Sequence, residues 1–353
     1  MAKQCLEDPE VTKGEGVSDR GPVLWFVGLT TLDIVHRGVV PPTRNQKLTA
    51  TWQGVSAGGP AANAAVVAAR LGARAVLITA IGEGPLADVV RRDLASQEVE
   101  VLDLGSTPSS CAERSGVAGS REGVDFSLAV SAILVDEETG ERSVVSPDGG
   151  RWTGPQAGAF DNAIRDYEMP DAILFDGHHP GIVHQIIKWL NNKPKMPKII
   201  LDGGRWKPIF SELLPIADVA ALSSDFLIPV EALRDTAISS SDEPQDDGVG
   251  VLNRALKMGA KAVAITNGPD PVKWATSYNE YGESKVPKVK AVDTLGAGDA
   301  FHGALTYAIA KEDNLPKAIE FANKVASMRV QYRGNRDWLE NIAALQRISG
   351  SEC

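Results

Sequence analysis

Short apolar runs alternate with helical patterns along most of this chain, and this alternation limits the folds open to it. The runs are four to seven residues long and largely apolar: Val23–Val27, Ala75–Ile81, Ala172–Asp176, Ile199–Asp202, Val219–Leu222 and Ala262–Thr266. Such runs are typical of strands buried on both faces, and the helical segments between them indicate parallel connections. We therefore predict an α/β protein whose mostly parallel sheet is covered by helices on both faces.

Two stretches depart from this alternation. Residues 34–57 and 108–147 contain strand-like segments, among them Leu48–Val55 and Val130–Val135, and a turn at Glu137–Gly140. The pattern around that turn is typical of antiparallel strands joined by a hairpin. We interpret the two stretches as a small β-lid that stands off the main sheet.

Two further segments contain few apolar residues. Residues 1–21 carry charges of both signs and lack the apolar stretch of a signal peptide, which predicts a loose N-terminal tail. Residues 235–248 are acidic, which predicts an exposed loop inserted before a helix. One folded unit is then expected over residues 22–348.

Charge limits the partners of the chain. Its 353 residues include 36 Lys and Arg against 46 Asp and Glu, a formal net charge of −10. An acidic surface repels phosphate backbones and anionic lipid, so we expect neither a nucleic acid nor a membrane as partner. No apolar run reaches the roughly 18 residues of a membrane span, and the three cysteines show no metal-binding spacing. We expect a cytoplasmic protein.

The segment richest in chemistry runs from residue 293 to 304. A strand-like run meets a tight turn at Gly296–Gly298, and a helix with an apolar face follows. Unpaired N–H groups and the helix dipole make such a helix N-terminus attractive to anions. Asp299 follows the turn directly, where a carboxylate could accept the proton of an attacking hydroxyl while the N–H groups neutralise a transferred phosphoryl group.

Other interpretations of this segment are weaker. An Asp in the first helical turn is common by itself, because it interacts favourably with the helix dipole. A dinucleotide-binding fingerprint would need a third glycine where Phe301 stands, and an acidic residue after a following strand. A Walker A loop is absent from the sequence.

The segment also resembles a known signature. Residues 293–301, DTLGAGDAF, are similar to the C-terminal motif D-T-x-G-A-G-D-x-F of the ribokinase-like (pfkB) carbohydrate kinases. Residues 58–63, GGPAAN, resemble the G-G-x-x-x-N segment of the same family, and Asp33 matches its substrate-binding Asp. The two motifs lie more than two hundred residues apart in the family's order. The chain is identified as a member, with similarity running loosely from residue 23 to 345.

The resemblance implies roles for the matching positions. Asp299 matches the catalytic base, and the backbone of Gly296, Ala297 and Gly298 matches the anion hole. The matches to residues that hold the sugar are Asp33, Gly58, Gly59 and Asn63. Carboxylate and amide groups suit vicinal hydroxyls, and glycine lets a sugar approach the backbone. Without the resemblance, the glycines would be interpreted as a turn and Asn63 as a helix cap.

The nucleotide side departs more from the family. Thr266 and Gly268 resemble a T-x-G that approaches the ATP phosphates, but Pro271 stands where a second glycine is usual. Asn323 is a candidate for the adenine pocket, with a solvent-facing side chain as the alternative. The family's N-x-x-E, which organises Mg²⁺, is replaced by SSDF at residues 223–226, which leaves Asp225 as the candidate metal contact.

Polar residues also follow two predicted strands, at the edge where α/β folds bind ligands. After Asp176, His178 and His179 suggest pocket lining, because adjacent histidines do not easily reach one metal ion. Asp202 and Arg205 resemble the D-x-N-x-R stretch of fructokinase-like members, with the arginine one place early.

Together the resemblance implies a ribokinase-like three-layer α/β/α fold and ATP-dependent phosphorylation of a sugar hydroxymethyl group. It implies ATP, Mg²⁺ and a monovalent cation as cofactors, and a homodimer formed through the lid. The run from Asp299 to Ala304 looks closer to ketose kinases (ketohexokinase, fructokinase, sulfofructose kinase) than to adenosine kinases. A nucleoside kinase and a non-catalytic scaffold remain the alternatives.

Overall fold

A computed structural model describes residues 21–38, 44–105, 128–147, 159–165, 167–233 and 249–342. Residues 1–20 of the predicted tail and the whole acidic segment 235–248 lie outside the described residues. Residues 106–127, which include the whole first half of the second predicted lid stretch, also lie outside them.

A nine-stranded sheet forms the centre of the molecule, in the order β13-β12-β11-β10-β9-β8-β1-β4-β5. Its strands are β1 (Val23–Val27), β4 (Arg74–Thr79), β5 (Glu100–Asp103), β8 (Ala172–Phe175), β9 (Lys198–Gly203), β10 (Val219–Ser223), β11 (Ala262–Thr266), β12 (Val272–Thr276) and β13 (Tyr281–Ser284). The strands from β5 to β11 pair in parallel, whereas β12 and β13 join antiparallel at one edge. The predicted mostly parallel sheet is confirmed.

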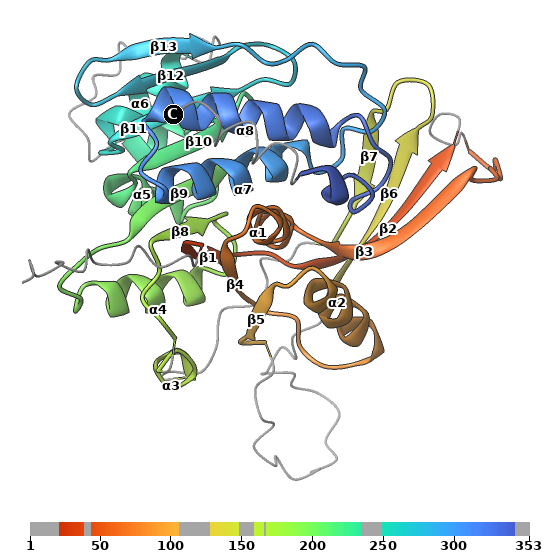
Figure 1. Ribbon diagram of the computed structural model, residues 1–353, viewed down its shortest axis with the longest axis horizontal. Helices are drawn as coiled ribbons and strands as arrows, with labels where there is room; N and C mark the ends of the chain where they lie inside the picture. The colour runs from red at the N-terminus through yellow and green to blue at the C-terminus, as the bar shows by residue number, and fades with distance from the viewer. Residues whose placement is uncertain are drawn as a thin grey trace, which may run out of the picture.

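Helices cover both faces of this sheet (Figure 1). They are α1 (Pro60–Arg70), α2 (Pro85–Ser96), α3 (Ala159–Ala163), α4 (Pro180–Leu190), α5 (Phe210–Leu213), α6 (Val249–Lys257), α7 (Ala297–Ala310) and α8 (Leu315–Arg329). Successive strand residues face opposite sides: Phe26 packs with the cluster under α1, α7 and α8, whereas Trp25 packs with the cluster under α4. This gives the three layers that the sequence predicts.

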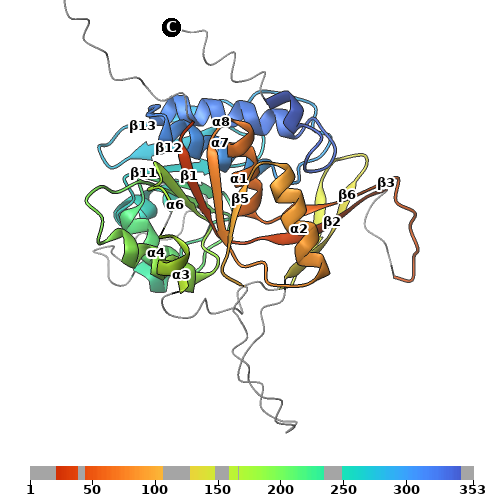
Figure 2. The same cartoon turned by 60° about the horizontal axis from the view of Figure 1, so that its bottom comes forward.

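A second sheet of four strands, in the order β3-β2-β6-β7, stands to one side of the three layers (Figures 1 and 2). It consists of β2 (Thr31–Gly38), β3 (Trp52–Gly58), β6 (Ala129–Asp136) and β7 (Arg142–Val145). β3 begins four residues later than the predicted Leu48–Val55, because β2 ends at Gly38 and its pairing with β3 starts at Arg37 and Trp52. We call this sheet the lid.

Candidate active site

The turn before α7 has the geometry expected of an anion site. Gly296 caps the helix with φ 72°, a left-handed conformation that favours glycine. The N–H of Ala297 donates to the Thr294 carbonyl over 3.3 Å. The N–H groups of Gly298 and Asp299 belong to the first turn, where helices leave donors without an intrahelical partner. A Cβ placed on Gly298 would meet no atom of the described parts of the chain within 4 Å, so the turn adjoins open space there.

Asn63 and Asp299 come together where α1 packs against α7. Gly303 allows the close approach, because a Cβ there would lie 2.5 Å from the carbonyl oxygen of Ala64. The result is a hydrogen bond of 2.7 Å from Nδ2 of Asn63 to Oδ2 of Asp299. The alternative interpretation of Asn63 as a helix cap is wrong, since Gly59 caps α1.

Asp33 approaches the same place from the lid strand β2. Its Oδ1 accepts a hydrogen bond from the Thr31 hydroxyl over 2.7 Å, and only 4% of the residue is exposed. Burial raises the pKa of Asp33, and the charge of Asp299 raises it further, against the hydrogen bonds from Thr31 and Ser131. Gly58 makes room for this carboxylate, because a Cβ there would lie 2.0 Å from Oδ2 of Asp33.

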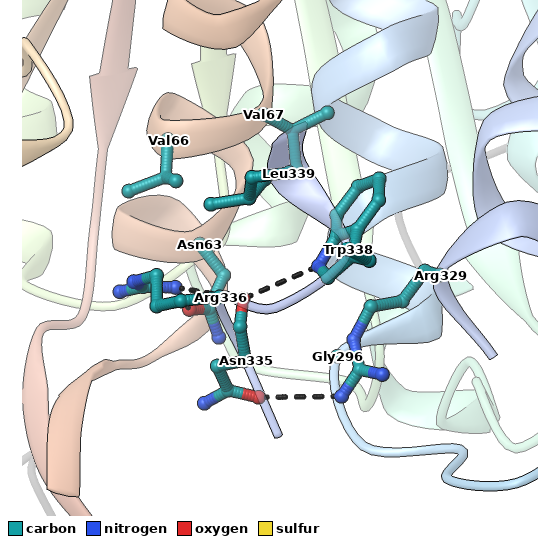
Figure 3. A pocket seen from close by; sticks show the side chains of 9 residues that line it. All are labelled: Asn63, Val66, Val67, Gly296, Arg329, Asn335, Arg336, Trp338 and Leu339. Carbon is teal, nitrogen blue, oxygen red and sulfur yellow. Dashed lines mark hydrogen bonds between the residues drawn. The ribbon is translucent and has the colours of Figure 1, made fainter. Parts of the chain in front are cut away.

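Arg336 ties these parts together and was not predicted from the sequence. Its Nη1 lies 3.4 Å from Oδ1 of Asn63, and its Nη2 donates to the carbonyl of Ala57 over 2.9 Å. An ion pair with Asp93 of α2 anchors the guanidinium at 2.8 Å. Because the arginine only donates, it orients the Asn63 amide with the NH₂ group toward Asp299. A small pocket with room for about one water adjoins this contact (Figure 3).

Asp176 anchors the segment that carries the glycine pair. Its Oδ2 accepts from the N–H of Leu29 over 2.8 Å and of Ala61, at the start of α1, over 3.3 Å. Burial alone would raise the pKa of Asp176, but the His178 ring, 3.0 Å away, and the positive charge of Lys207 hold it well below its usual range. Asp176 thus supports the start of α1, next to the glycine pair at residues 58 and 59. Among the described residues, no three His, Cys, Asp or Glu side chains form a group that could hold a metal ion.

Asp202 and His302 lie beside the turn formed by residues 296–299, which we call the anion turn. Oδ2 of Asp202 is 3.4 Å from Nδ1 of His302 and has no hydrogen-bond partner among the residues that the structure describes. Burial raises the pKa of Asp202 to about 6, against the charge of His302, and Asp299 adds to the increase. His302 in turn reaches the carbonyl oxygens of Gly298 at 2.7 Å and Ala221 at 3.1 Å. A buried carboxylate and an imidazole therefore support the first turn of α7.

Comparison with known proteins identifies the family. The chain matches the pfkB family carbohydrate kinase profile over residues 26–112 and 192–342, more than half of its length. The chain belongs to this family. It is therefore an ATP-dependent sugar kinase.

Individual relatives agree with this assignment. The kinase is 25% identical to the ribokinase of Staphylococcus aureus over 278 residues, 78% of this chain and 83% of that one. It is 23% identical to mouse ketohexokinase over 333 residues, 87% and 96% of the two chains. Two solved structures share the fold. Thermotoga maritima ribokinase has a TM-score of 0.63 and 20% identity over 92% of this chain and 99% of its own. Arabidopsis thaliana ribokinase complexed with ribose and ATP has a TM-score of 0.63 and 18% identity over 93% of this chain and 99% of its own. The predicted ribokinase-like fold is confirmed.

The predicted nucleotide residues Thr266 and Gly268 and the metal candidate Asp225 follow two neighbouring strands of the main sheet, β11 and β10. Thr266 ends β11, with its hydroxyl 3.4 Å from the Leu222 carbonyl, and Gly268 follows in a left-handed conformation. Asp225 is exposed just after β10, the neighbouring parallel strand. These three residues remain predictions for the nucleotide and metal sites.

Asn323 is not at the surface. Only 2% of it is exposed, and its Nδ2 reaches the carbonyl oxygens of Ser284 at 3.5 Å and Lys285 at 3.3 Å. The solvent-facing alternative is therefore wrong, because the amide ties α8 to the end of β13. Its place in an adenine pocket stays a prediction.

In the described part of the chain, no helix combines the length and apolar character that spanning a bilayer requires.

Proposed function

We propose that this kinase transfers the γ-phosphoryl group of ATP to a hydroxymethyl oxygen of a sugar held among Asp33, Asn63 and Asp299. The observation that carries the proposal is the 2.7 Å contact between Asn63 and Asp299 beside the N-terminus of α7. One hydroxyl placed at this contact can accept from the Asn63 amide while it donates to the Asp299 carboxylate. The same hydroxyl would face the open side of the anion turn.

The transfer follows from these positions. Asp299 accepts the proton of the hydroxyl as its oxygen attacks the γ-phosphorus, and the bond from phosphorus to the bridging oxygen of ADP breaks. The N–H groups of Gly298 and Asp299, with the helix dipole, oppose the charge that builds on the phosphoryl oxygens. Asp33 would hold further sugar hydroxyls from the lid, which excludes water when it covers the sugar.

Mg²⁺ fits this arrangement as a companion of the nucleotide. The ion commonly binds substrate phosphates, waters and only one or two carboxylates, and it neutralises phosphate charge. Asp225 is the exposed carboxylate that follows β10, and the neighbouring Ser224 donates its N–H to the Thr266 carbonyl over 2.9 Å. We infer that Asp225 contacts the water shell of the ion there.

For the sugar, we propose a ketose such as fructose or a related derivative. The motif around Asp299 supports this class, as does similarity to mouse ketohexokinase over 96% of that protein. A pentose is the second candidate, because ribokinases from Staphylococcus aureus and Bacillus subtilis are each 25% identical to this chain, against 23% for mouse ketohexokinase.

An ADP-release assay over fructose, sulfofructose, 2-keto-3-deoxygluconate, ribose and adenosine tests the proposal, with Asp299→Asn as the inactive control. We expect the highest kcat/KM with a ketose. A higher kcat/KM with ribose would establish the pentose candidate, and turnover of adenosine alone would establish a nucleoside kinase. Release of ADP with none of them would contradict the proposed sugar class.

We also propose that the lid forms a homodimer. Ile34 pairs with Val55 on one side and Ala132 on the other, and Ala132 pairs with Val145, so four apolar side chains form a row. Asp33 and its neighbours alternate onto the opposite face, and Val55 and Val145 are 50% and 75% exposed. Sedimentation should give a dimer that Val145→Glu dissociates, whereas a monomeric wild-type protein would contradict the proposal.

A further inference from the structure

Arg329, the last residue of α8, is buried behind the anion turn, with 1% of its side chain exposed. Its Nη1 donates to the carbonyl oxygen of Tyr332 over 3.0 Å and lies 3.4 Å from that of Asp293. Its Nη2 lies 3.5 Å from Oδ1 of Asn335, a contact visible in Figure 3. Protein oxygen atoms, rather than bulk water, therefore surround the guanidinium.

Asp293 supplies the negative charge of this cluster. It is fully buried, and its Oδ2 lies 3.7 Å from Nη2 of Arg329. The carboxylate also accepts from the N–H of Leu295 over 3.0 Å and of Gly334 over 2.9 Å. It thus joins the segment leading into the anion turn to the chain that follows α8. A buried carboxylate in this position needs a compensating cation.

The arginine is also close to the turn itself. A Cβ placed on Gly296 would lie 3.9 Å from Nε of Arg329 and 3.8 Å from Oδ2 of Asp299. Burial lowers the pKa of Arg329, while the charges of Asp293 and Asp299 raise it, and a guanidinium keeps its proton in proteins. A permanent positive charge therefore lies directly behind the N–H groups that face the phosphate.

The oxygens around this charge are those a metal cation would use. A carboxylate, two main-chain carbonyls and an amide oxygen form a hard, all-oxygen ligand set. The resemblance to the family implies a monovalent cation among the cofactors. In this cluster the guanidinium already occupies the centre of the oxygens, so the residues present do not fit an added ion.

We propose that the Arg329 guanidinium replaces the monovalent cation in this kinase, by balancing Asp293 and holding the anion turn. The effect of Arg329 on catalysis rests on the proposed function, whereas its effect on protein stability does not. It implies that the enzyme requires neither potassium nor sodium. It also implies that removal of the guanidinium creates a site that a potassium ion can fill.

The first test compares wild-type rates in potassium, sodium and tetramethylammonium chloride at equal ionic strength, which keeps screening constant. We expect the sugar-dependent rates to agree within about twofold, a barrier difference of about 0.4 kcal/mol. A rate that rises about tenfold or more on addition of potassium would overturn the proposal. Thermal unfolding of the wild type in the same salts should likewise show no stabilisation specific to potassium.

The second test uses Arg329→Ala and, as a matched control, Arg74→Ala, whose ion pairs with Glu100 and Glu168 are half exposed. Potassium should raise the melting temperature of Arg329→Ala by about 3 °C or more over tetramethylammonium, and should leave the control unchanged. Potassium should also restore part of the lost kcat. If Arg329→Ala folds but responds equally to both salts, the proposal is wrong.

Rates and melting temperatures test the proposed function and the replacement of the cation separately. If no sugar is phosphorylated in any salt, the proposed function fails while the melting temperatures still test the cation replacement. If Arg329→Ala does not fold in either salt, Arg329→Lys is measured instead. Because its ammonium keeps a positive charge beside Asp293, its melting temperature should be the same in potassium and tetramethylammonium, and a rise specific to potassium would contradict the proposal. Potassium-dependent stabilisation of the wild type would contradict the proposal whichever variant folds.

Discussion

Nδ2 of Asn63 donates to Oδ2 of Asp299 over 2.7 Å, although the two residues are 236 positions apart in the sequence. The contact exists because Gly303 lets α7 pack directly on the backbone of α1 at Ala64. Arg336 holds the other side of the amide, so the NH₂ group points at the carboxylate. In the proposed function, one hydroxyl at this contact would accept from the Asn63 amide and donate to the Asp299 carboxylate.

Replacement of Asn63 by Ala should weaken sugar binding more than ATP binding. The loss of a hydrogen bond near a charged group is worth about 1.5–3 kcal/mol, which predicts an increase in the sugar KM of about 10- to 100-fold. Steady-state kinetics with each substrate varied in turn would measure this. Asn192→Ala, at an exposed position after α4, is the control. Equal increases in both KM values would remove Asn63 from the sugar pocket.

Gly58→Ala should displace Asp33, because the new Cβ would lie 2.0 Å from its carboxylate. A displacement of about 1 Å in a substrate-binding group can cost about 10²-fold in kcat/KM. Gly38→Ala, in the same lid sheet, is the control, since the nearest described atom to its Cβ would be the Thr49 carbonyl oxygen at 3.9 Å. If both variants keep wild-type kcat/KM for the sugar, Asp33 does not bind it.

Asp202→Asn should stabilise the protein in a pH-dependent way. Burial raises the pKa of Asp202 from 3.8 to about 6, so its ionisation costs the folded state stability as pH rises from about 4 to 6. The asparagine avoids this cost, which amounts to about 2–3 kcal/mol above pH 7 and vanishes below pH 4.

Melting temperatures of Asp202→Asn and wild type across this pH range provide the measurement. The exposed Asp161→Asn on α3 is the control and should shift little at any pH. Stabilisation of Asp202→Asn that is equal at pH 4 and pH 8 would argue against ionisation of a buried carboxylate as the cause.

Sequence patterns predicted those features that depend on neighbouring residues. The anion turn from Gly296 to Asp299 is one, because its glycines and its carboxylate are adjacent and their chemistry is local. The buried strands are another, since each needs only a short apolar run. The predicted start of β3 is four residues too early, because the strand extends only as far as its pairing with β2, which begins at Arg37 and Trp52.

Residues that act through distant contacts gave no such signal. Arg336 and Arg329 lie among ordinary residues, and their contacts are with residues distant in the sequence. His302 lies within the segment 293–304, but its contact with the Ala221 carbonyl depends on the distant strand β10. Gly303 carries no motif of its own, yet its missing side chain brings Asn63 to Asp299. The one available hint was the pair of well-separated motifs, which predicted that Asn63 and Asp299 serve one site but not what supports them.

The most direct test of the account is the turnover of Asp299→Asn with the best sugar. The asparagine keeps the shape and an oxygen that can accept from Asn63, but it does not take up a proton. We predict that kcat falls about 10²- to 10⁴-fold, a barrier increase of about 3–5 kcal/mol, with melting temperature and ATP affinity close to wild type. Near-wild-type turnover by a folded Asp299→Asn protein would contradict its role as the proton acceptor.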